Sequence, residues 1–588
     1  MRKNPKKHKS NEEKVVCGVI SITSKGAGYV AVPDFQDDIF IDVPHTKTAF
    51  NKDEVEVVLF PAREQFKTRA GKVVKIVKRF KERFVGTLKK ENGRTFLVPD
   101  DYKIHKDFLI LDAPKEAEEN LKTLVRLTKY EEGENPEATI IKIIGRRGEH
   151  RAEMESILLG KGFETGFPPQ TEEEAEKIGK QEKPIKEEEI KTRRDFRGVT
   201  TFTIDPKTAK DFDDAISLRE IASSKVPAQK SEIKNPTYEI GIHIADVSHY
   251  VKEDSALDKE ARERAFSVYL VDRTIPMLPE VLSNDLCSLN PKEARLAFSA
   301  VFEIDGNGHV LSRWFGRTVI YSDKRFTYEE AQDVLDKKEG EFFKELRVLN
   351  DIAHKLKEEK FRQGAIDFET EEFEFELDSE GKPLKIFKKK RLDTHKLVEE
   401  FMLLANREVA EFFWQASIKS DKSGKKESPF LYRIHDVPNA EKIGELAVFV
   451  RALGHELSIS KSGEVTGKDL QALFRQIEGT PNESLIKTAA VRSMAKAIYS
   501  TANIGHFGLS FEYYTHFTSP IRRYPDLLVH RMLDRILKNR KVGPDEFVRL
   551  EKIAKRSTEK EIAASEAERE SRKLKQVEYM SDKIGREF

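Results

Sequence analysis

Short runs of apolar residues recur along the first quarter of the chain between polar and turn-forming residues, which is the pattern of successive β-strands. Short apolar runs, separated by Gly, Pro, Asp and Asn turns, fill residues 15–77, and a second set fills residues 78–145. The dipeptide Asn92-Gly93 separates two runs of the second set and predicts a tight hairpin. We therefore expect two successive small β-barrels.

The pattern then changes to helices and to a mixed domain. Residues 146–196 predict one short helix followed by a highly charged connector. Residues 197–543 alternate strand-like runs such as YEIGIHIADV with helical stretches, which indicates a large α/β domain. Residues 544–588 predict a charged helical segment without a compact core of its own. The chain is therefore predicted to be a multidomain α+β protein.

Helical periodicity is clearest in three places of the large domain. The expected helices cover residues 328–361 and 394–417, and a third begins near Pro525. In the second of them Leu397, Phe401 and Leu404 recur at helical spacing, so we expect these side chains to pack in the core.

Composition narrows the classes of function. The 588 residues are 38% hydrophobic, enough for several packed domains, and the net charge of +1 gives no general attraction to polyanions. Cys17 and Cys287 are the only cysteines, which argues against a disulfide scaffold or a cysteine zinc site and suits a reducing cytoplasm. No apolar run approaches the ~20 residues of a membrane-spanning helix. Residues 1–14 are basic without an apolar stretch after them, so they predict a solvated tail or a weak nucleic-acid-binding arm, not a secretory signal.

Four aspartates lie within ten positions of the segment IDPKTAKDFDDAISL. Asp205, Asp211, Asp213 and Asp214 fall between two apolar runs, on a predicted connection between strands. Carboxylates this close repel one another, and their pKa values rise unless a cation compensates. Oxygen ligands without nearby cysteine suit magnesium or manganese better than zinc. The loop is either a polar turn whose aspartates cap backbone amides or a site for metal-assisted phosphoryl chemistry, and the number of carboxylates favours the metal site.

A second segment, YYTHFTSPIRRYPDLLVHR, has the chemistry of a phosphate site. Arg522 and Arg523 stand just ahead of the helix expected from Pro525. Arginine forks and helix N-termini both suit phosphate oxygens. Alone, such a pair is more often structural, but together with an acidic metal loop it predicts a phosphate clamp.

These segments occur in the order found in the ribonuclease II/ribonuclease R family, and the resemblance is closer to the ribonuclease R branch. The motifs that carry it are TIDPKTAKDFDDAISL, IADVSHYV, SVYLVDRTIPMLPEVLSNDLCSLNP, HKLVEEFMLLAN and HFTSPIRRYPDLLVHR. The resemblance implies two N-terminal OB-fold barrels, the first of them cold-shock-like, ahead of a large α/β catalytic domain. It also implies a processive 3′–5′ exoribonuclease that hydrolyses single-stranded RNA to nucleoside 5′-monophosphates, with magnesium as cofactor and usually as a monomer.

The resemblance assigns roles to residues of the two motifs. Asp205 and Asp214 correspond to metal ligands, and Asp211 to a supporting carboxylate. Asp213 corresponds to the carboxylate whose loss abolishes cleavage. Arg522 corresponds to the arginine that holds the scissile phosphate.

The resemblance also assigns contacts with RNA. Tyr269 and Phe368 are similar to the aromatic residues that clamp the terminal bases, although packing in a strand or in the core would also account for them. Glu399 or Glu400 corresponds to a helix carboxylate near the last nucleotide, and the choice between them stays open. Arg523 is grouped with these contacts because it neighbours the phosphate-binding arginine.

The first barrel carries a partial cold-shock pattern in SKGAGYVAVPDFQDDIFI. Ala27 stands where that pattern has an aromatic residue, while Tyr29 and Phe40 remain as stacking platforms for bases. Each stacked base contributes about 1–3 kcal/mol, so we expect weaker RNA binding than by a full cold-shock domain, or a barrel that only guards a channel entrance. The sequence stops at Phe588, where family members continue into a C-terminal OB-fold domain, so a truncated product, an interrupted gene or a natural short form is expected.

The leading hypothesis is a magnesium-dependent exoribonuclease in which metal ions serve the in-line attack of water on the last phosphodiester. One rival is a non-catalytic RNA-binding protein on the same fold. Another is a metal-dependent endonuclease or a DNA nuclease. A non-catalytic relative would be free to lose an aspartate or Arg522, and all of them are present here.

Overall fold

The computed structural model describes most of the chain in two compact units. The described residues are 15–32, 35, 37–61, 69–221, 236–368, 372–420, 429–540, 544–581 and 583–587, except for the side chains of 418–420 and 544–545. The first unit is built on residues up to Thr165, with residues 378–382 and 573–578, and the second on the remainder. The basic segment 1–14 lies outside the described residues.

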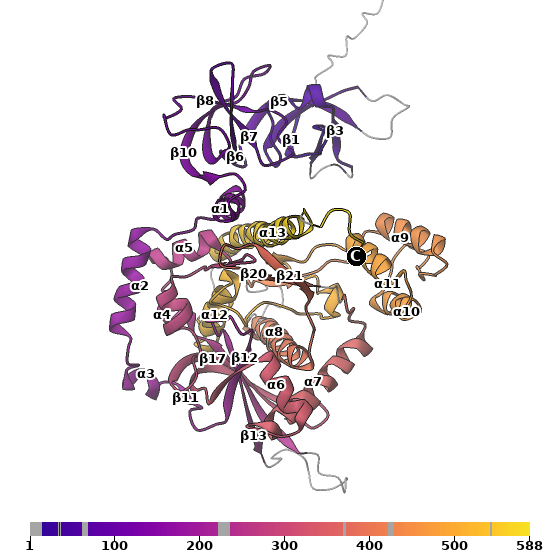
Figure 1. The fold of residues 1–588 in the computed structure, drawn as a ribbon. Helices are drawn as coiled ribbons and strands as arrows, with labels where there is room; N and C mark the ends of the chain where they lie inside the picture. The colour runs from indigo at the N-terminus through magenta and orange to yellow at the C-terminus, as the bar shows by residue number, and fades with distance from the viewer. Residues whose placement is uncertain are drawn as a thin grey trace, which may run out of the picture. The chain divides into compact units, whose positions relative to one another are not determined.

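Both expected barrels are confirmed in the first unit (Figure 1). The first closes in the order β1-β2-β3-β5-β4, and the second repeats this order with β6 to β10. This is the five-stranded OB arrangement. The strands are β1 (Val15–Ile22), β2 (Gly28–Ala31), β3 (Ile39–Ile41), β4 (Glu54–Leu59), β5 (Ala70–Lys78), β6 (Arg83–Glu91), β7 (Arg94–Pro99), β8 (Phe108–Ile110), β9 (Leu121–Lys129) and β10 (Glu137–Arg146), with a 3₁₀ turn η1 (Val43–His45) and the helix α1 (His150–Gly160).

The predicted hairpin at Asn92-Gly93 is also confirmed. It joins β6 to β7, where Glu91 pairs with Arg94. Both turn residues have positive φ, 50° at Asn92 and 73° at Gly93. A two-residue turn of this hand matches the twist of the strands, and Asn followed by Gly tolerates it at little cost.

Phe50 joins the two barrels into one body. It lies between β3 and β4, yet its buried ring packs in the core of the second barrel, where the ring centroids of Phe108 and Tyr130 are 6.0 and 5.3 Å away. Beside it, the fully buried Asp53 accepts a hydrogen bond from the amide of Phe50 at 2.9 Å and one from Arg79 Nη1 at 2.5 Å. A buried carboxylate with such partners is held in one geometry, so the junction between the barrels is fixed.

We predict that Phe50→Ala destabilises both barrels by about 3–5 kcal/mol, the usual loss for a buried phenylalanine. Hydrogen exchange measured by mass spectrometry should show lower protection of peptides from β1 to β10, while peptides of the second unit stay unchanged. Phe80→Ala is the matched control, because the ring of Phe80 is 46% exposed. Equal protection of the barrels in Phe50→Ala and in wild type would contradict the interlock.

The second unit is organised around a seven-stranded sheet in the order β11-β18-β17-β14-β13-β12-β19. Its four central pairs, from β18 to β12, are antiparallel, and β11 and β19 join the edges in parallel. The strands are β11 (Arg194–Asp195), β12 (Thr201–Asp205), β13 (Asp214–Ile221), β14 (Thr237–Ala245), β17 (Ala294–Asp305), β18 (Val310–Tyr321) and β19 (Lys324–Thr327).

Helices complete this unit (Figure 1). α8 packs against the sheet and against α6, α7 and α12. The helices are α2 (Pro169–Gln181), α3 (Glu187–Lys191), α4 (Val247–Tyr250), α5 (Ala256–Arg264), α6 (Tyr328–Lys337), α7 (Phe343–Gln363), α8 (Asp393–Ser420), α9 (Ala440–Ala452), α10 (Gly467–Ile477), α11 (Glu483–Ser493), α12 (Tyr524–Leu537) and α13 (Pro544–Ser581), with the short helical turns η2 (Val281–Leu286) and η3 (Phe507–Leu509). Three two-stranded pairs are β15 (Val268–Tyr269) with β16 (Thr274–Ile275), β20 (Phe373–Leu377) with β21 (Pro383–Lys388), and β22 (Tyr432–Ile434) with β23 (Ile498–Ser500).

The helix predictions hold with one correction. Leu397, Phe401 and Leu404 of α8 are buried in the main core, as their spacing predicts. The continuous helix expected over residues 328–361 is wrong, because the chain breaks between α6 and α7. Gly340 has a φ of 116° there, a conformation that an α-helix cannot include.

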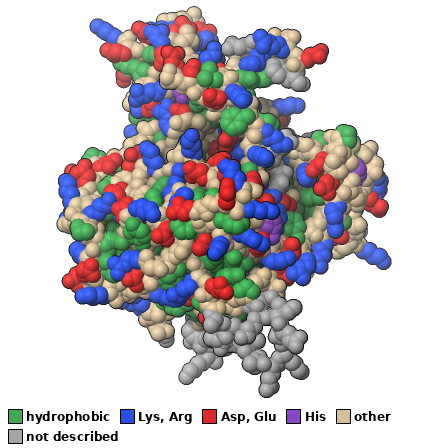
Figure 2. All heavy atoms as spheres, turned by 60° about the horizontal axis from the view of Figure 1, so that its bottom comes forward, with side chains coloured by type: hydrophobic (Ala, Val, Ile, Leu, Met, Phe, Trp, Pro, Cys, Tyr) green, Lys and Arg blue, Asp and Glu red, His purple; other side chains and the backbone are tan. Residues whose placement is uncertain are grey.

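Two surface properties bear on function. In the described part of the chain no helix is long and apolar enough to cross a bilayer. Lys and Arg side chains are interspersed with Asp and Glu over the face drawn in Figure 2. This mixture agrees with the net charge of +1, so local geometry has to account for any anion binding.

Candidate active site

The aspartate loop connects two adjacent antiparallel strands of the central sheet. Asp205 is the last residue of β12 and Asp214 is the first residue of β13, so the strand backbones fix both. Asp211 and Asp213 lie on the connection itself. The sequence correctly predicted a connection between strands, but only Asp211 and Asp213 lie on it, since Asp205 ends β12 and Asp214 begins β13.

Ser288 holds this connection in place. The buried hydroxyl of Ser288 accepts a hydrogen bond from the amide of Phe212 at 3.0 Å and donates to the carbonyl of Lys210 at 2.8 Å. On the other side, the amide of Ala245 at the end of β14 donates to the carbonyl of Asp213 at 2.8 Å. These hydrogen bonds fix the backbone of the loop, and the sequence analysis did not identify Ser288.

Asp213 links the loop to the arginine segment. Its Oδ1 accepts a hydrogen bond from the amide of Ile521 at 2.9 Å, and Arg522 Nε lies 3.3 Å from its Oδ2. Arg522 also donates from Nη2 to Ser519 Oγ at 2.8 Å. The side chain of Arg522 is 40% exposed, so its guanidinium remains accessible to an anion from solvent.

Arg523 behaves differently from its neighbour. Its Nε and Nη2 donate to the two oxygens of Asp526 at 2.9 and 2.6 Å, and its side chain is mostly buried. This bidentate pair fixes the start of α12. The structure thus gives Arg523 an internal partner, and its expected contact with RNA stays a prediction.

The carboxylates are crowded and poorly compensated. Asp205 Oδ2 and Asp213 Oδ2 are buried without a hydrogen-bond partner among the described residues. Burial and the charge of Asp214 raise the pKa of Asp205 to about 8, and burial raises the pKa of Asp214 to about 6. Burial also raises the pKa of Asp213 well above its usual range, although Arg522 opposes this. At neutral pH the loop is short of positive charge.

A divalent cation would relieve this crowding, so the residues fit a metal site. Asp205 Oδ2, which has no hydrogen-bond partner among the described residues, and the neighbouring carboxylate of Asp214 are hard ligands of the kind that magnesium prefers. Within the described ranges no group of three or more His, Cys, Asp or Glu side chains is arranged so that it could hold a metal ion. Magnesium ordinarily keeps several waters and takes phosphate oxygens from a substrate, so one or two carboxylates suffice to bind it.

Tyr269 lies beside the loop. Its hydroxyl donates to Asp211 Oδ2 at 3.3 Å, and the side chain is 36% exposed. The amide of Ser267 donates to the carbonyl of Arg522 at 3.0 Å, which holds β15 against the arginine segment. An exposed ring in this position is available for stacking on a base.

Phe368 and Glu400 lie on other elements. The half-buried ring of Phe368 meets Phe474 of α10 edge-on, with 6.0 Å between centroids, and packs on the small core of α9 to α11. Glu400 is buried and accepts from Lys360 Nζ at 2.5 Å, whereas Glu399 is exposed and paired with Arg391. The sequence could not distinguish these two adjacent glutamates, but their environments in the structure differ.

Tyr328 is a further candidate residue of the active site, and the sequence analysis did not identify it. It begins α6, and its phenol pKa is raised by burial and by the charges of Asp214 and Asp205. His395 of α8 stacks on its ring with 3.9 Å between centroids. The sequence does contain one indication of its position. The capping box of Thr327 and Glu330 marks the start of a helix directly after a strand, and Tyr328 is the first residue of that helix.

In the first unit, Tyr29 and Phe40 form the expected aromatic pair. They are cross-strand neighbours on β2 and β3, with ring centroids 5.5 Å apart. Tyr29 is 40% exposed. The pair therefore presents an aromatic surface on the first barrel.

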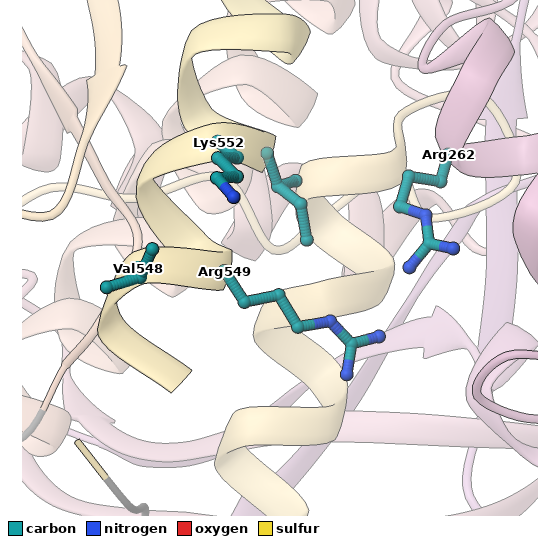
Figure 3. A pocket seen from close by; sticks show the side chains of 5 residues that line it. Arg262, Val548, Arg549 and Lys552 are labelled. Atoms are coloured by element: carbon teal, nitrogen blue, oxygen red, sulfur yellow. The ribbon is translucent and has the colours of Figure 1, made fainter. Parts of the chain in front are cut away.

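A separate basic cavity of about 390 Å³ lies between α5 and α13 (Figure 3). It is lined by Arg262, Val548, Arg549, Lys552 and Ile553. Both of its arginines are paired with Asp254, at 3.3 and 3.1 Å. None of the aspartates of the loop lines it, and its ion pairs connect the two helices.

Three family models match the chain. The RNB domain covers residues 193–539, the ribonuclease B OB domain covers residues 18–76, and the cold shock domain covers residues 96–168. Both barrels are thus of the OB type, and the cold-shock model falls on the second barrel, although the sequence pattern suggested it for the first.

Ribonuclease R of Thermotoga maritima is 38% identical over 98% of this chain and 79% of its own length. The chain belongs to the ribonuclease II/ribonuclease R family of 3′–5′ exoribonucleases. Among solved structures, Mycoplasma genitalium RNase R in complex with ribose-methylated single-stranded RNA has a TM-score of 0.85 at 24% identity, covering 97% of this chain and 88% of that one. Yeast Ssd1, a pseudonuclease, has a TM-score of 0.75 at 19% identity, covering 98% of this chain and 76% of that one.

The likeness to a pseudonuclease has a clear consequence. A ribonuclease R fold alone does not decide whether a chain cleaves RNA, since Ssd1 shares it. Nucleases with the RNB domain depend on a metal ion. In this chain the aspartate loop and Arg522 lie together, with Arg522 Nε 3.3 Å from Asp213 Oδ2.

We predict opposite effects of Asp205→Asn with and without metal. The folded-state pKa of about 8 lies above the ~3.9 of an unfolded aspartate. The metal-free wild type therefore loses stability as the pH rises through this window, and Asn removes the loss. In chelator at pH 8 the variant should melt at a higher temperature than wild type, and the difference should shrink at pH 5.

Magnesium should raise the melting temperature of wild type, because it binds the folded state, and should scarcely change that of Asp205→Asn. Asp333→Asn, on the exposed face of α6, is the matched control and should follow wild type. An equal magnesium response of Asp205→Asn and wild type would show that Asp205 is no ligand.

Proposed function

We propose that this exoribonuclease is processive and magnesium-dependent, and that it hydrolyses single-stranded RNA from the 3′ end to nucleoside 5′-monophosphates. It acts as a monomer in the cytoplasm, in RNA decay and quality control. The observation that carries the proposal is the position of Asp213, hydrogen-bonded to the amide of Ile521 and next to Arg522 in a loop of four carboxylates.

Asp205 and Asp214 hold the metal, and Asp211 supports the site. When bound, magnesium, or manganese in its place, lowers the pKa of water and offsets the charge of the phosphate. Arg522 donates to the phosphate oxygens, where negative charge develops during in-line attack. Asp213 orients Arg522 through the ion pair between its Oδ2 and Arg522 Nε.

Aromatic and polar side chains position the RNA. Tyr269 and Phe368 stack on the terminal bases, and Glu400 lies near the last nucleotide. Tyr29 and Phe40 stack on bases further from the 3′ end. Stacking is tolerant of sequence because every base has an aromatic face, which suits an enzyme that degrades RNA of any sequence.

A duplex with a single-stranded 3′ overhang is a second substrate in this proposal. What supports this substrate is the similarity to ribonuclease R, of which the Mycoplasma genitalium enzyme is known in complex with double-stranded RNA. The test measures the length of the final product from a duplex with a 3′ overhang. A product that still contains the whole duplex shows that degradation stops there, and a shorter product shows that degradation continues through it.

We predict that Asp213→Asn lowers release of mononucleotides by about 10³-fold or more, the scale of losing a principal charged group from an active site. RNA binding should stay within about twofold, because the change removes one charge at one contact. The measurement uses 5′-labelled single-stranded RNA with magnesium or chelator, resolved by gel electrophoresis. Asp333→Asn is the matched control.

Two substrates separate the rival activities. A 3′-blocked RNA should resist the enzyme, and internal fragments from it would indicate an endonuclease. A DNA of the same sequence should also resist. Unchanged turnover by Asp213→Asn would overturn the assignment of the site.

Tyr29→Ala and Phe40→Ala should each weaken binding of long single-stranded RNA by about 1–3 kcal/mol. Fluorescence anisotropy in the Asp213→Asn background measures this without cleavage. Phe60→Ala is the matched control, because Phe60 is also exposed on this barrel but packs edge-on against His45. Equal affinities would leave the first barrel without a stacking role.

A further inference from the structure

A buried ion pair joins α7 to α8 at the residue expected near the last nucleotide. Lys360 Nζ lies 2.5 Å from Glu400 Oε1, and the two side chains are only 9% and 5% exposed. Burial raises the pKa of Glu400, and Lys360 opposes that rise. Replacing such a pair with apolar residues often costs no stability, so stability alone does not explain its presence.

The end of α7 that carries Lys360 is tightly fixed. The amide of Ala365 donates back to the carbonyl of Lys360 at 3.1 Å, and Gly364 takes a φ of 109° to allow this turn. Gln471 of α10 donates from Nε2 to the carbonyls of Phe361 and Ala365 at 2.9 and 2.6 Å. The backbone that carries Lys360 is therefore fixed, and the contact with Glu400 holds its buried ammonium group.

The same turn leads directly to Phe368. The amide of Ile366 donates to the carbonyl of Gly508 at 2.9 Å, and Lys357 Nζ donates to Asp367 Oδ2 at 3.3 Å. Phe368 then packs on the core of α9 to α11. One rigid segment of nine residues thus contacts Glu400 at its start and carries the expected base-stacking ring at its end.

Glu400 retains the capacity to accept hydrogen bonds. A carboxylate offers about four lone-pair sites on two oxygens, and the hydrogen bond from Lys360 is made to Oε1. Ribose hydroxyls are suitable donors for the remainder, and the 2′-hydroxyl distinguishes RNA from DNA. Glu399, in contrast, has an exposed side chain and is paired with Arg391.

We propose that Lys360 is a positioning residue, which holds Glu400 ionised and oriented as the acceptor for the ribose hydroxyls of the 3′-terminal nucleotide. The inference rests on the proposed function, because it takes Glu400 to lie near that nucleotide. It adds that recognition of the RNA end depends on a lysine that itself contacts no RNA.

The test compares Lys360→Met, Glu400→Gln and the double variant on two matched RNAs. One RNA ends in a normal ribose and the other in a 2′-deoxyribose. On the ribose end, Lys360→Met should raise KM about 10- to 100-fold, the scale of losing a charge-assisted hydrogen bond, with kcat within about threefold. On the deoxyribose end, the KM values of wild type and variant should approach each other.

The double variant decides whether Lys360 acts through Glu400. It leaves no unpaired buried charge, so it should fold even if Lys360→Met alone does not. Its KM should equal that of Glu400→Gln, and a further rise of 10-fold or more would overturn the inference. Lys360→Arg keeps the charge and should recover part of the selectivity, while Lys355→Met, exposed on the same helix, should match wild type.

Failure of the inference and failure of the proposed function are distinguishable. If wild type releases no mononucleotides from the ribose-ended RNA with magnesium, the proposed function has failed. If wild type is active and Lys360→Met discriminates between the two ends as wild type does, only the role of Lys360 is refuted.

Discussion

The hydrogen bond from the amide of Ile521 to Asp213 Oδ1 is the contact on which the site depends, and it joins residues 308 positions apart. It brings the aspartate loop to the arginine segment and leaves the guanidinium of Arg522 beside the same carboxylate. Since Asp213 is almost wholly buried among like charges, it needs these donors to be tolerated at all. Three features hold this contact in place. They are the order of the central sheet, the hydrogen bonds of Ser288, and the ion pair of Arg523 with Asp526 at the start of α12.

The large domain contains two kinds of buried carboxylate, one that is compensated by arginines and one that is not. Burial alone would raise the pKa of Asp246, but Arg317 and Arg193 hold it below the usual range, and Arg193 Nη1 lies 2.8 Å away. Asp205 has no such arginine pair, and burial with Asp214 raises its pKa to about 8. A compensated buried charge organises a core, whereas an uncompensated cluster is a place where a cation or substrate is expected.

What the sequence could predict was local. The short apolar runs, the Asn92-Gly93 turn and the aspartate loop depend on neighbours in the chain, and the structure agrees with them. Tertiary contacts decided the rest. Phe50 belongs by sequence to the first barrel but packs in the second. Arg522 and Arg523 are adjacent and alike, and only the position of Asp526 makes one internal and leaves the other accessible. No periodicity contains that information.

The cost of the aspartate cluster is itself an argument for catalysis. Substitution of Asp205 by an apolar residue would remove a buried carboxyl group that has no hydrogen-bond partner for one of its oxygens, and a buried polar group without a partner costs stability. A chain that had lost its chemistry, as a pseudonuclease of the same fold has, would gain stability from this change and lose nothing. All four aspartates and Arg522 are nevertheless present together. Their shared destabilisation is explained if a cation and an RNA phosphate complete the site in the working enzyme.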